Sequence, residues 1–304
     1  MTRFFRLFFL FLLLTSFQAK AQTMDSLRSK IEQLLSTKKA VVGVSISGID
    51  AKDTMSINGL KRFPLQSVFK FHIGLTVLAE IDKGRFSLDQ KIEIRKKDLL
   101  PDLYSPIRDQ YPEGATLTLA EILEYTIAQS DNVGCDLLLR LLGGPQKVEQ
   151  YFQSKGFRDI SIKINEEVAQ SNWDLQFRNW ITPKTANRIL QAFYYNKNKL
   201  LSQSSYDFVW KTMRGTLTGQ DRLKGKLPEG TIVAHKTGSS GTNKATGITA
   251  AVNDIGVVFL PNGQHFFISV LVTDSKENAS DNELIIAEIA RAAWDYFTTP
   301  RLSL

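Results

Sequence analysis

PLQSVFKFHIG, residues 64–74, contains the two residues on which the interpretation of the whole chain depends. Ser67 and Lys70 lie three residues apart at the start of an apolar run. In a helix this spacing places two side chains on one face, with about 5–6 Å between their Cβ atoms. The serine is either a nucleophile with a lysine beside it or simply the N-cap of a helix. The rest of the chain has to distinguish these two interpretations.

The first 21 residues have the layout of a secretory signal peptide. Arg3 and Arg6 form a basic start, residues 7–14 are apolar, and residues 19–21 read Ala-Lys-Ala, an A-x-A cleavage site. The apolar run is shorter than the roughly 20 residues that a membrane span needs. The alternative is an uncleaved anchor. We expect cleavage after Ala21 and a periplasmic or secreted protein that leaves the membrane.

Composition limits the function classes. The chain of 304 residues has a net charge of +7, and three of its basic residues lie in the predicted signal peptide. The remaining basic residues are spread along the chain, whereas a nucleic-acid footprint gathers on one face. Cys135 is the only cysteine, so no internal disulfide can form. We expect an exported monomer that is held together by packing and binds no nucleic acid.

Two strand-rich segments enclose a helical middle. Residues 24–36 have helical periodicity, and residues 40–57 are rich in β-branched residues and predict a hairpin. From residue 85 to 215 the chain reads as mostly helical, with a capping box at Thr118-x-x-Glu121. Strands return after residue 230, with Asn262-Gly263 as a hairpin turn, and Ser280-x-x-Glu283 is a predicted capping box at the start of a last helix.

This order predicts an α/β fold of the α+β kind. We expect an antiparallel sheet flanked by the two terminal helices, with an all-helical lobe inserted into it. Residues 22–62 and 216–304 would form the α/β lobe, and residues 63–215 the helical lobe. Together they would form one catalytic domain over residues 22–304, with its pocket between the lobes.

Two further motifs make the nucleophile interpretation much more specific. Ser130-Asp131-Asn132 follows a predicted helix, and Lys236-Thr237-Gly238 lies on the first late strand. Each motif alone is common. In combination, S-x-x-K, S-D-N and K-T-G are the signature of class A β-lactamases and penicillin-binding proteins.

At these residues the sequence resembles the class A serine β-lactamases, and among them the PER/VEB-type extended-spectrum subgroup. The resemblance covers nearly the whole mature chain. The stretches that carry it are LLPDLYSPI (99–107), SDNVGCD (130–136), RLKGKLP (222–228) and KTGSSG (236–241). It implies the serine β-lactamase and DD-peptidase-like fold.

The resemblance also implies a role for each site residue. Ser67 would be the nucleophile, Ser130 would pass a proton to the leaving nitrogen, and Glu166 would hold the water that attacks the acyl-enzyme. Glu167 is the alternative carboxylate. The backbone N–H groups of Ser67 and Ser239 would form the oxyanion hole. The residues expected to bind substrate are Asn132, Lys236, Thr237, Ser239, Arg222, Tyr104 and Gln170.

The sequence does not decide whether Lys70 or Glu166 acts as the base in acylation. A serine hydroxyl is a weak nucleophile and needs a base beside it. Lys70 could serve if it is neutral, with Lys236 and Arg222 as cations that would lower its pKa. The other candidate is Glu166 acting through water, a choice that is disputed for this family.

Two positions depart from the common family pattern. Gln170 replaces the usual Asn, for which the subgroup usually has His, and Asp136 replaces the Asn of most class A enzymes. We expect Asp136 to change how the loop around Glu166 is held. We also expect this loop to leave a wide cavity that admits bulky cephalosporins.

Three functions share the motifs. The first is hydrolysis of penicillins and cephalosporins through an acyl-serine, which confers antibiotic resistance; the alternatives are a DD-peptidase or penicillin-binding protein, and a β-lactam sensor that stays acylated. The expected partner is a small β-lactam. His72, His235 and His265 lie far apart and form no ligand pattern, so we expect neither metal nor cofactor.

Overall fold

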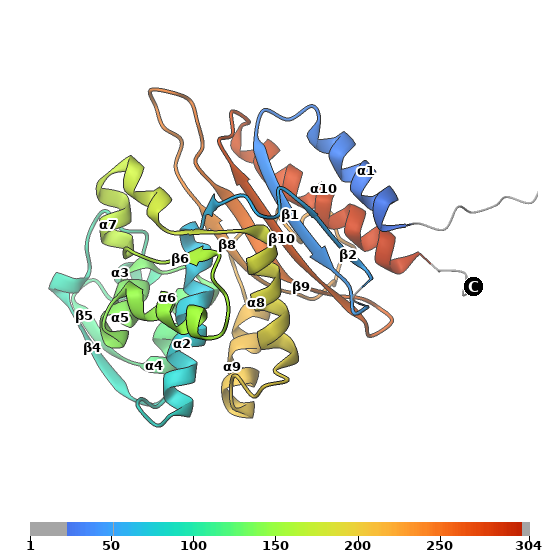
Figure 1. Ribbon diagram of the computed structural model, residues 1–304. Helices are drawn as coiled ribbons and strands as arrows, with labels where there is room; N and C mark the ends of the chain where they lie inside the picture. Colours follow the sequence, from blue (N-terminus) through green and yellow to red (C-terminus); the bar gives the residue numbers. More distant parts are fainter. Residues whose placement is uncertain (1–22, 51, 300–304) are drawn as a thin grey trace, which may run out of the picture.

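A five-stranded antiparallel sheet organises the protein (Figure 1). The computed structural model describes residues 23–50 and 52–299, so the predicted signal peptide lies outside the described residues. The strand order is β2-β1-β10-β9-β8, which places strands from both ends of the chain side by side. The strands are β1 (Val41–Ser47), β2 (Thr54–Ile57), β8 (Val233–Ser239), β9 (Val252–Phe259) and β10 (His265–Thr273).

The two terminal helices cover one face of this sheet, as predicted (Figure 1). They are α1 (Met24–Leu35) and α10 (Ala279–Thr298). The predicted capping box at Ser280-x-x-Glu283 is wrong. Asn278 is the N-cap of α10 and accepts the N–H of Asp281, while the Ser280 hydroxyl donates to Asn278. Asparagine competes well for this position because its carbonyl reaches the free amides of the first turn.

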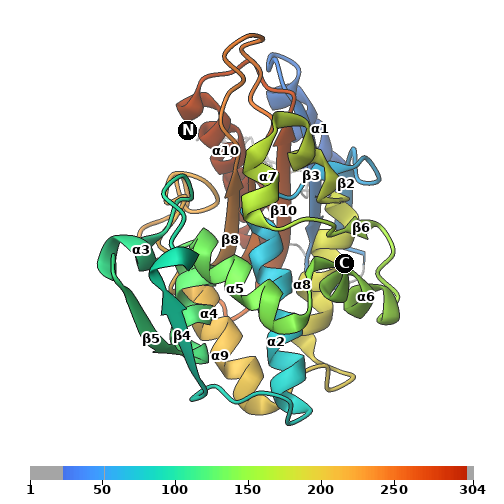
Figure 2. The ribbon, with the colours of Figure 1, turned by 90° about the vertical axis from the view of Figure 1, so that its left-hand side faces the viewer.

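The other face of the sheet meets the helical lobe. Its central helix is α2 (Phe69–Asp82), in which every residue from Phe69 to Ala79 is buried. A helix that is apolar all round belongs in the middle of a domain. Around it lie α3 (Pro106–Gln110), α4 (Leu119–Ala128), α5 (Asn132–Leu142), α6 (Pro145–Ser154), α7 (Glu166–Ser171), α8 (Pro183–Tyr195) and α9 (Gln203–Arg214). Figure 2 faces this lobe and shows α5 between α4 and α7.

The helical lobe also contains two small sheets, which the expectation of an all-helical lobe missed. β4 (Lys91–Arg95) pairs with β5 (Gly114–Thr118). β7 (Trp180–Ile181) pairs with both β3 (Phe63–Pro64) and β6 (Ile160–Ser161). Strands as short as two residues leave no readable alternation in a sequence. β7 nevertheless ties the segment before Ser67 to the polar loop after residue 160.

The two lobes share one apolar core. α8 packs against β1 and β10, and α9 packs against β8, although both helices lie in the range assigned to the helical lobe. Phe267 and Leu271 of β10 belong to the same buried cluster as the helices around α2. Within the described residues, no helix is long and apolar enough to cross a membrane. The shared core fixes β8 relative to the start of α2.

Candidate active site

The predicted site residues gather where the edge of β8 meets the helical lobe. A cavity of about 590 Å³ lies there. Lys70 and Lys236 are fully buried beneath it. The other predicted residues all line it: Ser67, Tyr104, Ser130, Asn132, Glu166, Gln170, Arg222, Thr237 and Ser239.

Ser67 does not cap a helix. It lies in the 3-10 turn η1 (Gln66–Val68), and no side chain caps η1 or α2. Its hydroxyl accepts a hydrogen bond from Lys70 Nζ at 2.9 Å. The Ser67–Lys70 spacing therefore brings a hydroxyl and an ammonium into contact, and the N-cap interpretation is wrong.

Lys70 connects the serine to a loop carboxylate. Its Nζ lies 2.9 Å from Glu166 Oε1 and donates to the backbone oxygen of Ser130 at 2.8 Å. It also contacts Asn132 Oδ1. The Ser67 hydroxyl oxygen lies 3.5 Å from Glu166 Oε1. One buried ammonium thus holds the nucleophile, the carboxylate and the Ser-Asp-Asn turn together.

The structure distinguishes the two adjacent glutamates. Glu166 is the first residue of α7 and is buried, whereas Glu167 is exposed. Only Glu166 lines the cavity. We therefore keep Glu166 as the carboxylate of the site.

Asp136 on α5 anchors the loop that carries Glu166. Its Oδ1 accepts the Glu166 N–H at 2.8 Å, and its Oδ2 accepts the Glu167 N–H and the Asn165 side-chain amide, both at 3.0 Å. Burial raises the pKa of Asp136 to about 6. The Asp136 carboxylate thus binds backbone amides rather than the Glu166 side chain, so these two acidic residues can lie close together.

The Ser-Asp-Asn turn positions one wall of the cavity. Ser130 has a φ of +63°, which turns the chain sharply between α4 and α5. Asp131 caps α5 through the Gly134 N–H and also accepts the Ser105 hydroxyl at 2.8 Å. The Asn132 N–H donates to the Tyr104 backbone oxygen at 3.0 Å. These bonds place Tyr104, which is 56 % exposed, at the mouth of the cavity.

Lys236 on β8 lies buried behind the opposite wall. Its Nζ donates to Ser130 Oγ at 3.0 Å and thereby joins the two lobes across the cavity. Burial, together with the positive charge of Lys70, holds the pKa of Lys236 well below its ordinary value. Thr237 follows, and its hydroxyl lies 2.5 Å from that of Thr218.

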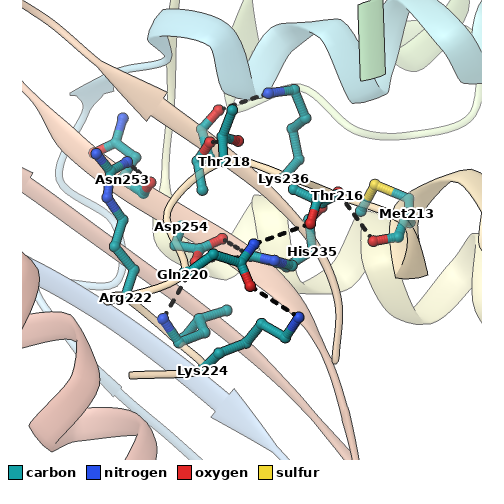
Figure 3. A network of polar contacts seen from close by, with 12 residues as sticks. Met213, Thr216, Thr218, Gln220, Arg222, Lys224, His235, Lys236, Asn253 and Asp254 are labelled. Carbon is teal, nitrogen blue, oxygen red and sulfur yellow. Dashed lines mark hydrogen bonds and ion pairs between the residues drawn. The ribbon is translucent and has the colours of Figure 1, made fainter. Parts of the chain in front are cut away.

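Arg222 supplies a second cation behind the strand. Its Nη2 donates to Ser239 Oγ at 2.7 Å, and its Nη1 donates to the backbone oxygens of Gly238 and Asn253 at 3.1 and 3.0 Å. Its Nε lies 3.3 Å from Glu283 of α10. Figure 3 shows Arg222 in this network with Asn253 and Lys236. The guanidinium thus positions the Ser239 hydroxyl, which lines the cavity.

Sequence reasoning missed several residues of the site. Gln66, Trp173, Gln176 and Thr218 all line the cavity. Gln66, the residue before the nucleophile, donates to Gln176 at 2.7 Å and thereby connects the turn of Ser67 to the loop after Glu166. No local spacing indicates such contacts, because the partners are 110 residues apart.

The histidines and the cysteine lie outside the cavity. His235 Nδ1 lies 2.9 Å from Asp254, and both side chains are fully buried. Cys135 is buried, and burial raises its pKa, which favours the inert thiol. Burial lowers the pKa of His72 to about 4. Among the described residues, no group of three His, Cys, Asp or Glu side chains could hold a metal ion.

Comparison with known proteins agrees with this geometry. A model of the beta-lactamase enzyme family matches residues 26–297. The chain belongs to this family. It is 53 % identical to beta-lactamase VEB-1 of Pseudomonas aeruginosa over 94 % of this chain and 95 % of that protein. It is 39 % identical to the extended-spectrum beta-lactamase PER-1 of the same species over 93 % of this chain and 90 % of that one.

Solved structures show the same fold. The TLA-1 extended-spectrum beta-lactamase superposes with a TM-score of 0.88 at 48 % identity, covering 91 % of this chain and all of that one. This chain is therefore a class A serine β-lactamase, as the resemblance at the three motifs implied. The predicted fold class is also confirmed. Its activity is the hydrolysis of β-lactams.

Proposed function

We propose that the enzyme hydrolyses penicillins and cephalosporins through an acyl-enzyme on Ser67 and confers resistance to them. The observation that carries this proposal is the position of Glu166. Its carboxylate lies 3.5 Å from the Ser67 hydroxyl oxygen and 2.9 Å from Lys70 Nζ. A carboxylate at this place can activate water beside an ester on Ser67.

Acylation uses the Lys70–Glu166 pair as the base. The proton of the Ser67 hydroxyl passes to this pair while Oγ bonds to the carbonyl carbon of the lactam. The backbone N–H groups of Ser67 and Ser239 stabilise the oxyanion that forms. The carbon–nitrogen bond of the ring then breaks, and the Ser130 hydroxyl gives its proton to the nitrogen. The proton held by the Lys70–Glu166 pair passes to Ser130 Oγ, which restores this hydroxyl and leaves Glu166 able to accept a proton again. Lys236 donates to Ser130 Oγ at 3.0 Å and keeps this hydroxyl in place.

Deacylation uses Glu166 and water. Glu166 accepts a proton from a water molecule while the oxygen of that water bonds to the acyl carbon. The bond between that carbon and Ser67 Oγ breaks, and the proton returns to Oγ. The product acid then leaves. Asp136 keeps Glu166 in place because it binds the backbone amides at the start of α7.

The substrate's groups match the two walls. Its carboxylate would bind Lys236, Thr237 and Ser239, with Arg222 as a second cation behind Ser239. The Asn132 side chain would form hydrogen bonds with the amide group of the substrate's side chain. Tyr104 and Gln170 lie on the exposed rim. The cavity of about 590 Å³ is within the range of drug-sized ligand sites. The extended cephalosporin spectrum is supported by the similarity to the extended-spectrum beta-lactamase PER-1.

The alternatives are a penicillin-binding protein and a sensor. Both need the serine and the lysines, but neither needs a carboxylate that turns over the ester. The buried Glu166 therefore favours the hydrolase. We further propose that residues 1–21 direct export to the periplasm or medium and that residues 22–304 act as one monomeric domain without metal or cofactor.

Turnover of nitrocefin tests the proposal. We expect purified protein to hydrolyse many equivalents, and Ser67→Ala to hydrolyse none. A single stoichiometric burst would instead identify a penicillin-binding protein or sensor. The spectrum is tested by comparing an oxyimino-cephalosporin with benzylpenicillin. Negligible relative turnover of the cephalosporin would contradict the extended spectrum.

A further inference from the structure

Asn253 connects the two strands of the site to the turn that carries the nucleophile. It lies on β9 opposite Gly238 of β8, and it is fully buried. It does not line the cavity, so it has no direct contact with a substrate there. Figure 3 shows it beside Arg222. Its side chain nevertheless makes three hydrogen bonds, one to its own sheet and two to a different part of the chain.

Those two bonds hold the segment just before Ser67. Asn253 Nδ2 donates to the backbone oxygen of Pro64 at 2.8 Å and to that of Leu65 at 3.2 Å. Its Oδ1 accepts the N–H of Val272 on β10 at 3.2 Å, which fixes the orientation of the amide. The partners are almost 190 residues apart in the chain. The amide thus anchors this turn to the middle of the sheet.

The same turn is strained and tightly packed. Gln66, between Leu65 and the nucleophile, has a φ of +47°, a region that non-glycine residues rarely adopt. Such a conformation persists only where the surroundings hold it in place. Gly238 makes the close approach possible, since a Cβ on it would lie 2.8 Å from the Leu65 oxygen and 3.1 Å from the Ser67 nitrogen.

The backbone oxygen of Asn253 points to the other half of the site. It accepts Arg222 Nη1 at 3.0 Å, and the same nitrogen donates to the Gly238 oxygen at 3.1 Å. Asn253 is therefore bonded on one side to the turn before Ser67 and on the other to the cation behind Ser239. Ser67 and Ser239 are the two residues whose amides form the proposed oxyanion hole.

We infer that Asn253 is a positioning residue that sets the separation of the Ser67 and Ser239 amides. It acts through the backbone of residues 64–67 and does not touch the substrate. This inference rests on the proposed function, because the oxyanion hole is part of that mechanism. Oxyanion-hole donors act through distance and direction, so a small displacement lowers the rate.

The test replaces Asn253 by leucine, which has a similar volume but no donor. We expect kcat/KM for nitrocefin to fall roughly 10- to 100-fold, mainly through slower acylation. The matched control is Asn187→Leu. Asn187 is 1 % exposed and donates to Ser47 Oγ between α8 and β1, away from the cavity. If Asn253→Leu fails to fold, Asn253→Ser keeps a small polar side chain that is too short to bridge to Pro64.

A second readout separates positioning from stability. Phenylboronic acid bonds to Ser67 Oγ as the hydroxyl proton leaves, and its boron becomes a tetrahedral anion with an oxygen in the oxyanion hole. We expect its inhibition constant to rise by a factor similar to the loss in kcat/KM. In Asn187→Leu both values should stay within about threefold of wild type, whatever its melting temperature.

The outcomes are distinguishable from failure of the proposed function. If wild-type protein does not turn over nitrocefin, the proposed function fails. If wild type turns it over and the folded Asn253 variant matches Asn187→Leu in kcat/KM and in boronate affinity, the inference is overturned. A parallel loss of both values in the Asn253 variant alone supports it.

Discussion

The carboxylate of Asp136 holds the backbone of Glu166, with 2.8 Å between Asp136 Oδ1 and the Glu166 nitrogen. One acidic residue thus positions another without binding its side chain. The N–H groups of Glu166 and Glu167 at the start of α7 would otherwise be orphan donors of a helix N-terminus. A buried carboxylate there complements the helix dipole and leaves the Glu166 side chain free to reach Lys70.

Glu166 is expected to act in deacylation, whereas Glu167 is not. In Glu166→Gln the amide cannot accept the water proton, so the acyl-enzyme should accumulate and the steady-state rate should fall by about 10²–10⁴. Intact-protein mass spectrometry after mixing with benzylpenicillin would detect the added mass. Glu167→Gln is the matched control and should keep turnover close to wild type. Accumulation in Glu167→Gln instead would reverse the assignment.

Asp136 should make the stability depend on pH. Its folded pKa of about 6 lies above the ordinary value of 3.8, because burial disfavours the charged form. The folded protein thus binds more protons than the unfolded chain between these values, and this group's contribution to stability is lost as the pH rises through 6. Two pKa units correspond to roughly 3 kcal/mol.

Urea unfolding of wild type and Asp136→Asn measures this contribution. Subtracting the free energy of unfolding of the variant from that of wild type removes the other titrating groups. We expect the difference to fall by roughly 3 kcal/mol between pH 4 and pH 7, with the wild type losing stability relative to the variant. A difference that stays constant over this range would show that Asp136 does not titrate near pH 6.

Lys236 should limit substrate binding at alkaline pH. Its pKa is well below the ordinary value because it is buried beside the charge of Lys70. As the pH rises through this lowered pKa, the ammonium loses its proton and its attraction for the substrate carboxylate, so KM for benzylpenicillin should rise. Lys236→Arg stays charged throughout this range. Its KM should therefore remain flat over the pH range in which the wild-type KM rises, and an identical alkaline limb in both proteins would contradict the role of Lys236.

The His235–Asp254 pair should be important for stability. Both side chains are fully buried, 2.9 Å apart, and Asp254 also accepts the Leu223 N–H at 3.3 Å. Removing one partner of a buried hydrogen bond typically costs about 1–3 kcal/mol, because the group left behind loses its partner without regaining water. We expect Asp254→Asn to lose an amount of this order in urea unfolding at pH 7.

An exposed ion pair provides the control for that experiment. Asp295 lies 2.7 Å from Arg291 on α10, and both side chains are partly exposed. Asp295→Asn should cost less than about 1 kcal/mol. Equal losses in Asp254→Asn and Asp295→Asn would show that the buried pair has no special weight.

Much of the local structure could be predicted from the sequence. The chain from residue 85 to 215 is mostly helical, and Thr118 caps α4 through the predicted capping box. Asn262-Gly263 does form the turn between β9 and β10. These features depend on neighbours within a few residues. The start of α10 was misplaced because two local capping signals competed there. The two-residue strands β3, β6 and β7 were too short to show a period, whereas β4 and β5 are five residues long and were missed although β4 alternates.

The residues that supply the chemistry can be recognised without a structure: a hydroxyl and an ammonium one helical turn apart, the Ser-Asp-Asn turn, and a lysine on a strand. Local backbone geometry fixes those spacings wherever the segments lie. The folded arrangement was needed to show which glutamate reaches Ser67, 99 residues away, and that Asn253 holds the turn before it. Such contacts arise when the lobes pack around a shared core. Apolar periodicity marks the buried face of each element, but because hydrophobic burial is non-directional it does not specify which element that face will contact.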